Sequence, residues 1–311
     1  MRLASYRGPD GAPRTAAVVG DEGDERIVDL FDASGGRVPA GDLLSLLEAG
    51  PEALDAARSA SARASASRPL DSIQLLAPMA RPPKILAAAG NYQAHIVEGG
   101  AQPVDKTVIV PKLFMKPSSA VIAPGAPVPM STVSNTLDWE LELAVVIGRR
   151  GRDIPVERAL DYVAGYTVIN DISARTAEWG VAGRSPGEWD LFFDWLNGKW
   201  GDGYAPMGPW LVTTDEIPDP QALRMRLDVN GKTFQDAVTA DMIFSSAELI
   251  AFASRFMTLE PGDTFATGTP SGVGDSTGTY LKEGDVMEGW IEKIGTLITP
   301  VTAPVRATAA V

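Results

Sequence analysis

The pattern of hydrophobic and polar positions divides the chain into two parts. Before residue 50, short apolar runs at 16–19 and 26–31 alternate with charged stretches, which predicts short strands and turns. From residue 84 onward, longer runs rich in β-branched and aromatic residues and bounded by glycine predict strands, most clearly at 141–148 and 162–171. The chain is therefore expected to be mixed α/β and predominantly β.

Few segments have helical spacing. Apolar positions repeat every three or four residues in 245–257, the segment 41–50 has similar spacing with a glycine stop, and a short helix is expected at 91–98. The segment 226–234 predicts a β-hairpin, because its Asn230-Gly231 pair tolerates the positive φ of a two-residue turn. Since strands do not alternate regularly with helices, a mixed-β roll or barrel-like fold is favoured over a doubly wound parallel sheet.

Composition suggests where the chain divides into domains. A length of 311 residues is typical of about two domains. Residues 51–69 are rich in Ala, Ser and Arg and predict an exposed helix or a linker that ends at Pro69. We therefore expect a small N-terminal α+β domain over residues 1–77 and a catalytic domain over residues 78–311.

Charge and rare residues limit the chemistry and the location. A formal net charge of −13 without a dense basic patch argues against nucleic acid as a partner. With no cysteine and one histidine, His95, any metal must be held mainly by oxygen, which indicates Mg²⁺, Mn²⁺ or Ca²⁺. The N-terminus lacks an apolar stretch of signal-peptide length, and no run approaches the ~18 residues of a membrane span, so the expected location is the cytoplasm without membrane contact.

Two glutamates stand at the start of the apolar run 141–148. Glu140 and Glu142 share one face, because side chains alternate along a strand; a solvated strand face would explain an isolated pair of this kind. The residues that follow are apolar on both faces, however, and a strand buried on both faces should not carry two unpaired carboxylates. A shared divalent cation resolves this conflict. Asp171, at the end of the second apolar run, is the natural third ligand, or alternatively a helix N-cap.

The single histidine has an acidic neighbour at helical spacing. His95 and Glu98 lie three residues apart, so one helical turn would place them on the same face. Glu98 could then orient His95 as a general base that activates water, and the glycines at 90, 99 and 100 would suit a hinged lid. A chance pair on an exposed helix is the alternative.

Isolated cations and a glycine-rich stretch are further candidates for contact with the substrate. Arg175 follows Asp171 by four residues, so a helical turn would bring it beside the metal, where it could bind a substrate carboxylate bidentately. For each of the cations Lys116, Arg175 and Lys199, a surface ion pair is the alternative. The stretch 267–274 lacks a phosphate-loop motif; its backbone N–H groups and Thr269 could contact an anionic ligand, unless it is a plain β-turn.

Aromatic residues cluster in one segment. Four of the 7 tryptophans lie within residues 176–200, together with two phenylalanines. Such a cluster could line a substrate pocket, and core packing or a subunit contact is at least equally expected.

The order of these motifs resembles that of the fumarylacetoacetate hydrolase family. The resemblance spans roughly residues 78–300 and is carried by the stretches GNYQAHIVE, PKLFMKPSSAV, DWELELAVVIG, YVAGYTVINDISAR, LDVNGKTFQ and PGDTFATGTPSGVG. It implies that family's mixed β-sandwich roll in the bacterial two-domain form, usually a homodimer that binds Mg²⁺ or Mn²⁺.

The resemblance also implies roles for particular residues. The metal ligands would be Glu140, Glu142 and Asp171, and the catalytic residues would be His95, Glu98 and Lys199. Substrate contacts are implied for Tyr92, Lys116, Arg175 and Thr269. The segment 177–197 is longer than in the shortest members, and Trp200-Gly201 departs from the usual pair after the lysine, so the acyl group of the substrate is left open.

These features predict a metal-dependent hydrolase that cleaves a carbon–carbon bond in a 2,4-dioxo acid of the acylpyruvate or fumarylpyruvate type. The same site would also serve decarboxylation of oxaloacetate or isomerisation of a 2-oxo acid. The third alternative is a non-catalytic binding protein in which the carboxylates hold a structural cation. Such a protein would need neither the His95–Glu98 pair nor Lys199.

Overall fold

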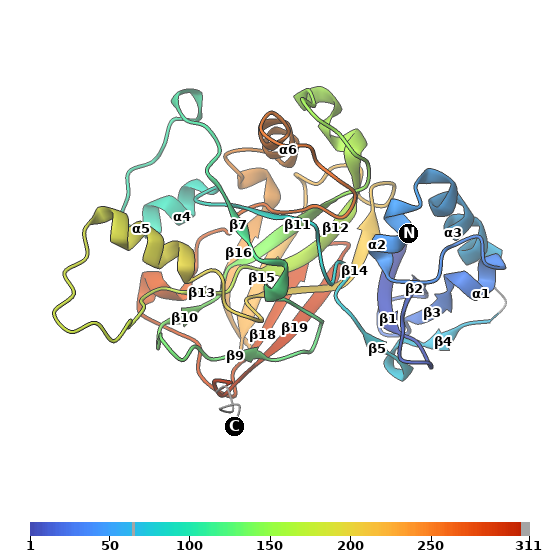
Figure 1. The fold of residues 1–311 in the computed structure, drawn as a ribbon, viewed down its shortest axis with the longest axis horizontal. Coiled ribbons are helices and arrows are strands. Elements are labelled where there is room, and N and C mark those ends of the chain that lie inside the picture. Colours follow the sequence, from blue (N-terminus) through green and yellow to red (C-terminus); the bar gives the residue numbers. More distant parts are fainter. Residues whose placement is uncertain (64–65, 306–311) are drawn as a thin grey trace.

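The computed structural model describes residues 1–63 and 66–305, which form a small and a large body (Figure 1). The small body, blue in Figure 1, contains β1 (Arg2–Arg7), β2 (Pro13–Val19), β3 (Arg26–Asp29), α1 (Leu30–Ser34), α2 (Leu43–Glu48), α3 (Pro51–Arg63), β4 (Arg68–Pro69) and β5 (Gln74–Leu75).

The large body holds the remaining elements. Its helices are α4 (Gln93–Glu98), α5 (Glu188–Asn197) and α6 (Ser246–Ser254). Its strands are β6 (Ile85–Ala88), β7 (Leu113–Lys116), β8 (Val121–Ile122), β9 (Val128–Pro129), β10 (Leu137–Asp138), β11 (Leu141–Ile147), β12 (Val163–Asn170), β13 (Ser173–Ala174), β14 (Ala205–Thr213), β15 (Arg224–Val229), β16 (Lys232–Val238), β17 (Thr264–Ala266), β18 (Val286–Ile291) and β19 (Gly295–Thr302).

A 12-stranded sheet runs through both bodies. Its order is β4-β3-β2-β1-β14-β12-β11-β17-β6-β7, with β5 beside β1 and β8 beside β14. The antiparallel pairing of β1 with β14 joins the two bodies into one sheet. The domain boundary between residues 77 and 78 stays a prediction, and it would divide parts that share this sheet. The path ends at β4 and β7 without closing. The mixed, predominantly β architecture is thus confirmed, whereas the barrel-like alternative is wrong.

A second sheet, in the order β16-β15-β18-β19-β9, packs against the central one. The approach is close, because a Cβ built on Gly289 of β18 would lie 2.8 Å from Leu141 Cδ1 of β11. Strand β11 is buried on both faces: Leu143 belongs to the apolar cluster shared with β15, β18 and β19, and Ala144 to the cluster shared with α2 and α3. The prediction of an apolar strand buried on both faces is confirmed.

Local signals in the sequence account for several elements. The hairpin forms between β15 and β16 with Val229 opposite Lys232, and its two turn residues have the expected positive φ, 51° at Asn230 and 75° at Gly231. Helix α6 begins after Ser245, whose hydroxyl and backbone N–H exchange hydrogen bonds with Glu248 in a capping box. It ends at Ser254, earlier than the predicted 257.

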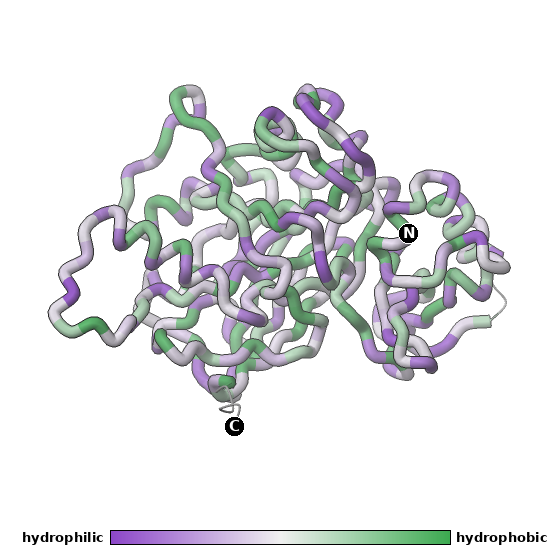
Figure 2. The backbone as a smooth tube through the Cα atoms, in the orientation of Figure 1, coloured by the Kyte–Doolittle hydropathy of each residue, from purple (hydrophilic) through white to green (hydrophobic). Residues whose placement is uncertain are grey.

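The Ala- and Ser-rich segment forms α3 as far as Arg63 and is not only an exposed helix. Its alanines at 53, 56, 57 and 60 are buried, because small side chains allow this face of the helix to pack closely. Figure 2 shows hydrophobic positions along many strands and hydrophilic positions on many outlying loops. Within the described residues, no helix combines the length and the apolar character needed to cross a membrane.

Candidate metal centre and active site

Three carboxylates, here called the triad, meet where β11 and β12 lie side by side. Leu141 of β11 lies opposite Asn170 of β12, so Glu140 just before β11 comes next to Asp171 just after β12. The Asp171 backbone N–H donates to the Glu140 carbonyl at 2.8 Å. One carboxylate oxygen each of Glu140, Glu142 and Asp171 lies within 4.8 Å of the others, and the most exposed of the three residues is 5% exposed.

Two buried lysines neutralise part of the charge of the triad. Lys199 Nζ donates to Glu140 Oε2 at 2.8 Å and to Asp171 Oδ2 at 2.9 Å. Lys116 Nζ donates to the other oxygen of Asp171 and to the Lys199 carbonyl. The two lysines therefore bind Glu140 and Asp171 and leave Glu142 without a bond to either of them.

Glu142 is the member without a cationic partner. Its carboxylate accepts the Gly268 backbone N–H at 2.7 Å and forms no ion pair within the described part of the chain. Burial, together with the nearby carboxylates of Asp171 and Glu140, raises the pKa of Glu142 well above its ordinary range. Lys199 and the Gly268 N–H favour the ionised form but do not outweigh these effects on the pKa, so a further cation at the triad would favour ionisation of Glu142.

The donor set fits a divalent cation. Asp138 and the triad supply four buried carboxylates, which face the three cations Lys116, Arg175 and Lys199, so one negative charge is left over. Burial of an uncompensated charge is costly, and hard cations such as Mg²⁺ and Mn²⁺ prefer carboxylate oxygens. The buried triad therefore suits divalent metal binding, as predicted from the sequence.

Arg175 belongs to the same cluster. Its Nε donates to Asp138 Oδ2 at 2.9 Å and its Nη1 lies 2.7 Å from Glu140 Oε1, whereas the buried Nη2 has no partner among the described residues. The expected helical turn after Asp171 is wrong, because the chain continues into β13, which pairs with β10 and sets Ser173 opposite Asp138. Arg175 could bind a substrate carboxylate bidentately only if its ion pair with Asp138 or with Glu140 were broken.

The predicted His–Glu pair forms on α4. His95 Nδ1 lies 2.8 Å from Glu98 Oε1, and Glu98 Oε2 accepts the Gly272 backbone N–H at 2.7 Å. Burial acts to raise the pKa of Glu98, but the hydrogen bonds from His95 and Gly272 outweigh it and lower that pKa. An ionised Glu98 keeps the proton on Nδ1, so Nε2 is left as the acceptor.

The glycine-rich stretch binds anions, but these belong to the protein. Its backbone N–H groups donate to three carboxylates: that of Gly268 to Glu142, that of Gly272 to Glu98, and that of Gly274 to Asp138, each at 2.7 Å. Gly272 has φ of 101°, and a Cβ there would lie 1.9 Å from the Phe234 carbonyl oxygen. These three N–H groups therefore position side chains of the protein, while the expected contact of Thr269 with a ligand stays a prediction.

One member of the His–Glu pair, His95, and one member of the triad, Glu140, line the same pocket of about 390 Å³. Its lining includes His95, Glu140, Arg175, Lys199 and Thr269, with the apolar Ile96, Phe114 and Trp195. Burial would raise the pKa of Glu140, but Lys199, Arg175 and His95 together lower it below its ordinary range. His95 thus lies close enough to act electrostatically on a triad carboxylate.

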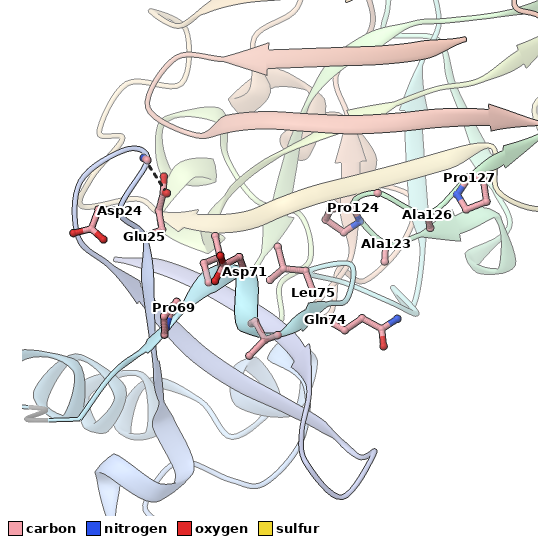
Figure 3. A pocket seen from close by; sticks show the side chains of 14 residues that line it. Asp24, Glu25, Pro69, Asp71, Gln74, Leu75, Ala123, Pro124, Ala126 and Pro127 are labelled. Atoms are coloured by element: carbon pink, nitrogen blue, oxygen red, sulfur yellow. Dashed lines mark hydrogen bonds between the residues drawn. The ribbon is translucent and has the colours of Figure 1, made fainter. Parts of the chain in front are cut away.

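A larger pocket of about 830 Å³ lies between the small body and the loop 123–127 (Figure 3). Its polar side chains Asp24, Asp71 and Gln74 are exposed, and its other walls are mainly Pro, Ala and Leu. Reactive groups with perturbed pKa values are typical of active sites. The smaller pocket at the triad has such groups and is the better candidate.

The three remaining residues expected to contact substrate are engaged within the protein. Tyr92 is 1% exposed and its hydroxyl lies 3.5 Å from the Met225 sulfur in the core, so it does not line the pocket. Lys116 is buried against Asp171. Thr269 does line the pocket, but its hydroxyl donates to the Leu141 carbonyl at 3.0 Å. Of these three residues, we retain only Thr269 as a candidate for direct contact with the substrate.

The Trp-rich segment divides between two surfaces. Trp195 on the inner side of α5 lines the pocket and packs edge-on against Phe114, with ring centroids 4.9 Å apart. Trp189 on the same helix is 75% exposed. The expectation that this aromatic cluster could line a pocket thus holds for Trp195. Sequence reasoning missed Phe114 as a wall residue, and also Asp138, which belongs to the same acidic motif as Glu140 and could have been included on that ground.

Comparison with known protein families identifies the family of this chain. A family model described as fumarylacetoacetate (FAA) hydrolase C-terminal matches residues 84–302. The chain belongs to the fumarylacetoacetate hydrolase family. The triad, the His–Glu pair and the pocket residues all lie within the matched range. This assignment confirms the resemblance inferred from the sequence motifs.

Relatives within the family catalyse several reactions. The mitochondrial oxaloacetate tautomerase of Xenopus laevis is 39% identical over 97% of this chain and 90% of its own length. The crystal structure of maleylpyruvate hydrolase from Sphingobium sp. SYK-6 with manganese(II) and pyruvate has a TM-score of 0.75 at 32% identity, covering 98% of this chain and 100% of that one. The 5-carboxymethyl-2-hydroxymuconate delta-isomerase of Mycobacterium smegmatis has a TM-score of 0.72 at 31% identity, covering 97% and 100%.

These comparisons establish the broad class of this fumarylacetoacetate hydrolase family member. The relatives are enzymes that act on small organic acids, which disfavours the alternative of a non-catalytic binding protein. Because they include a tautomerase, a hydrolase and an isomerase, family membership does not specify the reaction.

Proposed function

We propose that this protein is a divalent-metal-dependent hydrolase that cleaves a carbon–carbon bond in a small 2,4-dioxo acid. The observation that carries the proposal is that His95 of the His–Glu pair and Glu140 of the oxygen-rich triad line one pocket. Hydrolysis needs both a base to activate water and positive charge to stabilise an enolate.

His95 is the proposed general base. Its Nε2 takes a proton from water, and the hydroxide attacks the carbonyl carbon farther from the substrate carboxylate. The bond from that carbon to the neighbouring methylene breaks, and its electron pair becomes the enolate of the departing 2-oxo acid. The protonated His95 then returns a proton to the enolate carbon, so one water is consumed and two acids are formed.

The cluster around the triad supports the departing enolate. A bound divalent cation would supply Lewis-acid charge that stabilises the enolate oxygen. Lys199, which lines the same pocket, adds positive charge beside Glu140. The unpartnered Nη2 of Arg175 offers an N–H donor to a substrate oxygen.

Oxaloacetate tautomerisation is the second candidate. It is favoured by the 39% identity to the Xenopus laevis tautomerase, which extends over 97% of this chain. In that reaction His95 would move a proton between the carbon and the oxygen of the enol without consuming water. Decarboxylation of oxaloacetate would use the same positive charge.

The test is a substrate panel assayed with metal-stripped protein before and after addition of Mg²⁺ or Mn²⁺. Acetylpyruvate and fumarylpyruvate report hydrolysis through release of pyruvate and a second acid. Oxaloacetate reports tautomerisation through the ultraviolet absorbance of its enol and decarboxylation through release of CO₂. Metal-dependent cleavage of a dioxo acid supports the proposal, and activity confined to oxaloacetate assigns the second candidate or the decarboxylase. Silence across the panel refutes all three.

We further propose that the protein is a homodimer, as its family resemblance suggests. Size-exclusion chromatography with light scattering should then give about twice the chain mass of 32.9 kDa.

A further inference from the structure

We propose that Lys112 selects dicarboxylic substrates by binding a second carboxylate at the outer end of the pocket. The inference rests on the proposed function, because it names the class of 2-oxo acid that the site takes. Lys112 is a lining residue of the pocket that contains His95 and Glu140. It is exposed, and within the described residues its side chain forms no ion pair or hydrogen bond.

The position of Lys112 follows from strand alternation along β7. Lys112 directly precedes this strand and is still held against its neighbour, since its carbonyl accepts the Ala89 N–H at 2.9 Å. Side chains two and four residues apart share a face of a strand, so Lys112, Phe114 and Lys116 are on one side. Lys112 and Phe114 line the pocket, while Lys116 binds Asp171 of the triad.

This strand therefore spans the pocket from the triad to the outer end. Four residues at a strand rise of ~3.3 Å place the Cα atoms of Lys112 and Lys116 ~13 Å apart. A substrate whose 2-oxo acid group lies at the triad would point its other end toward Lys112. The distance leaves room for a chain of several carbons between the two ends.

The walls between the two ends are apolar. Phe114 and Trp195 pack edge-on with ring centroids 4.9 Å apart, and Ile96 and Val104 complete this part of the lining. At the inner end, the lining cations Arg175 and Lys199 are already paired with carboxylates, in contrast to Lys112. An apolar middle with charge at each end is complementary to a dianion with a hydrocarbon linker.

The net charge of the protein strengthens this reading. A chain with a formal net charge of −13 repels anions overall, so a dianionic substrate needs local positive charge at both of its carboxylates. A substrate with an uncharged distal end would make no use of Lys112. The free lysine at the outer end thus favours the dicarboxylic class.

The test compares two ligands that differ only at the distal end, 2-oxoadipate and 2-oxohexanoate. Isothermal titration calorimetry in saturating Mn²⁺ measures binding without requiring turnover. The wild-type protein should bind 2-oxoadipate about tenfold more tightly, which corresponds to about 1.4 kcal/mol. Lys112→Met should abolish this preference, and Lys112→Glu should invert it. Lys282→Met, at an exposed lysine outside the pocket, is the matched control and should keep it.

The outcomes separate this inference from the proposed function. If the wild-type protein binds both ligands equally, or if Lys112→Met keeps the preference for the diacid, the role of Lys112 is refuted while metal-dependent 2-oxo acid binding stands. If neither ligand binds to the wild-type protein in the presence of Mn²⁺, the proposed function fails and the inference fails with it.

Discussion

Replacement of Glu142 by glutamine should remove most of the stabilisation by metal without damaging the metal-free protein. Glutamine keeps the shape of the side chain and an oxygen that can accept the Gly268 N–H. It removes a buried carboxylate that has no cationic partner among the described residues, and whose pKa is raised by burial and by the carboxylates of Asp171 and Glu140. The metal-free variant should therefore be at least as stable as the metal-free wild type.

The expected size of the metal effect follows from mass action. At a metal concentration 100 times Kd, binding to the folded state adds about 2.7 kcal/mol to the free energy of unfolding. For a chain of 311 residues, whose entropy of unfolding is about 0.65 kcal/mol/K, that raises Tm by about 4 °C. If the loss of one carboxylate weakens binding about 100-fold, the upper end of the effect of losing a supporting group, the same concentration adds only about 0.4 kcal/mol.

Thermal unfolding of chelator-treated protein, with and without added Mn²⁺, measures both effects. Glu283→Gln removes an exposed carboxylate and should respond to metal as the wild type does. The reasoning would be refuted by an equal rise in Tm for Glu142→Gln and the wild type. It would also be refuted if the metal-free variant unfolded well below the metal-free wild type, since Glu142 would then stabilise the protein without a cation.

Three further substitutions test the neighbouring groups. His95→Gln should lower kcat about 100-fold or more while keeping the rise in Tm with Mn²⁺, and unchanged turnover would exclude His95 as the base. Asp138→Asn removes one of the two charged partners of the buried Arg175 guanidinium and should lower the free energy of unfolding in urea by about 1.5–3 kcal/mol; an unchanged midpoint would contradict the importance of this ion pair. Gly272→Ala should destabilise more than Gly23→Ala, because both have positive φ but only at Gly272 would a Cβ meet a backbone oxygen, that of Phe234 at 1.9 Å.

Signals contained within a few residues were sufficient to predict several elements and the triad. The Asn230-Gly231 turn and the helix that begins after Ser245 depend on neighbours close in sequence, and both form as expected. Glu140 and Glu142 were recognised because an apolar strand cannot bury two carboxylates without compensation, and β11 is indeed buried on both faces. The conflict between local hydrophobicity and local charge was itself the signal.

Features that depend on long-range pairing could not be predicted. The open sheet requires β1 to pair with β14 and β17 to pair in parallel with β6, and neither register is encoded in a local pattern. Arg175 was assigned to a helical turn because it follows Asp171 by four residues. It reaches the cluster across the pairing of β10 with β13 instead, since Ser173 lies opposite Asp138.

The glycine-rich loop shows how a local signal can be correct in chemistry and wrong in partner. Its backbone N–H groups do bind anions, as glycine-rich backbone often does. The carboxylates they bind lie 126, 174 and 136 residues away in the sequence, at Glu142, Glu98 and Asp138. These three side chains belong to the triad, to the His–Glu pair and to the ion pair with Arg175. One loop therefore fixes a member of each group, while His95, Glu140 and Arg175 from the same groups line the pocket. Glycine is required at 268 and 272 because φ is positive there and a Cβ would meet neighbouring atoms.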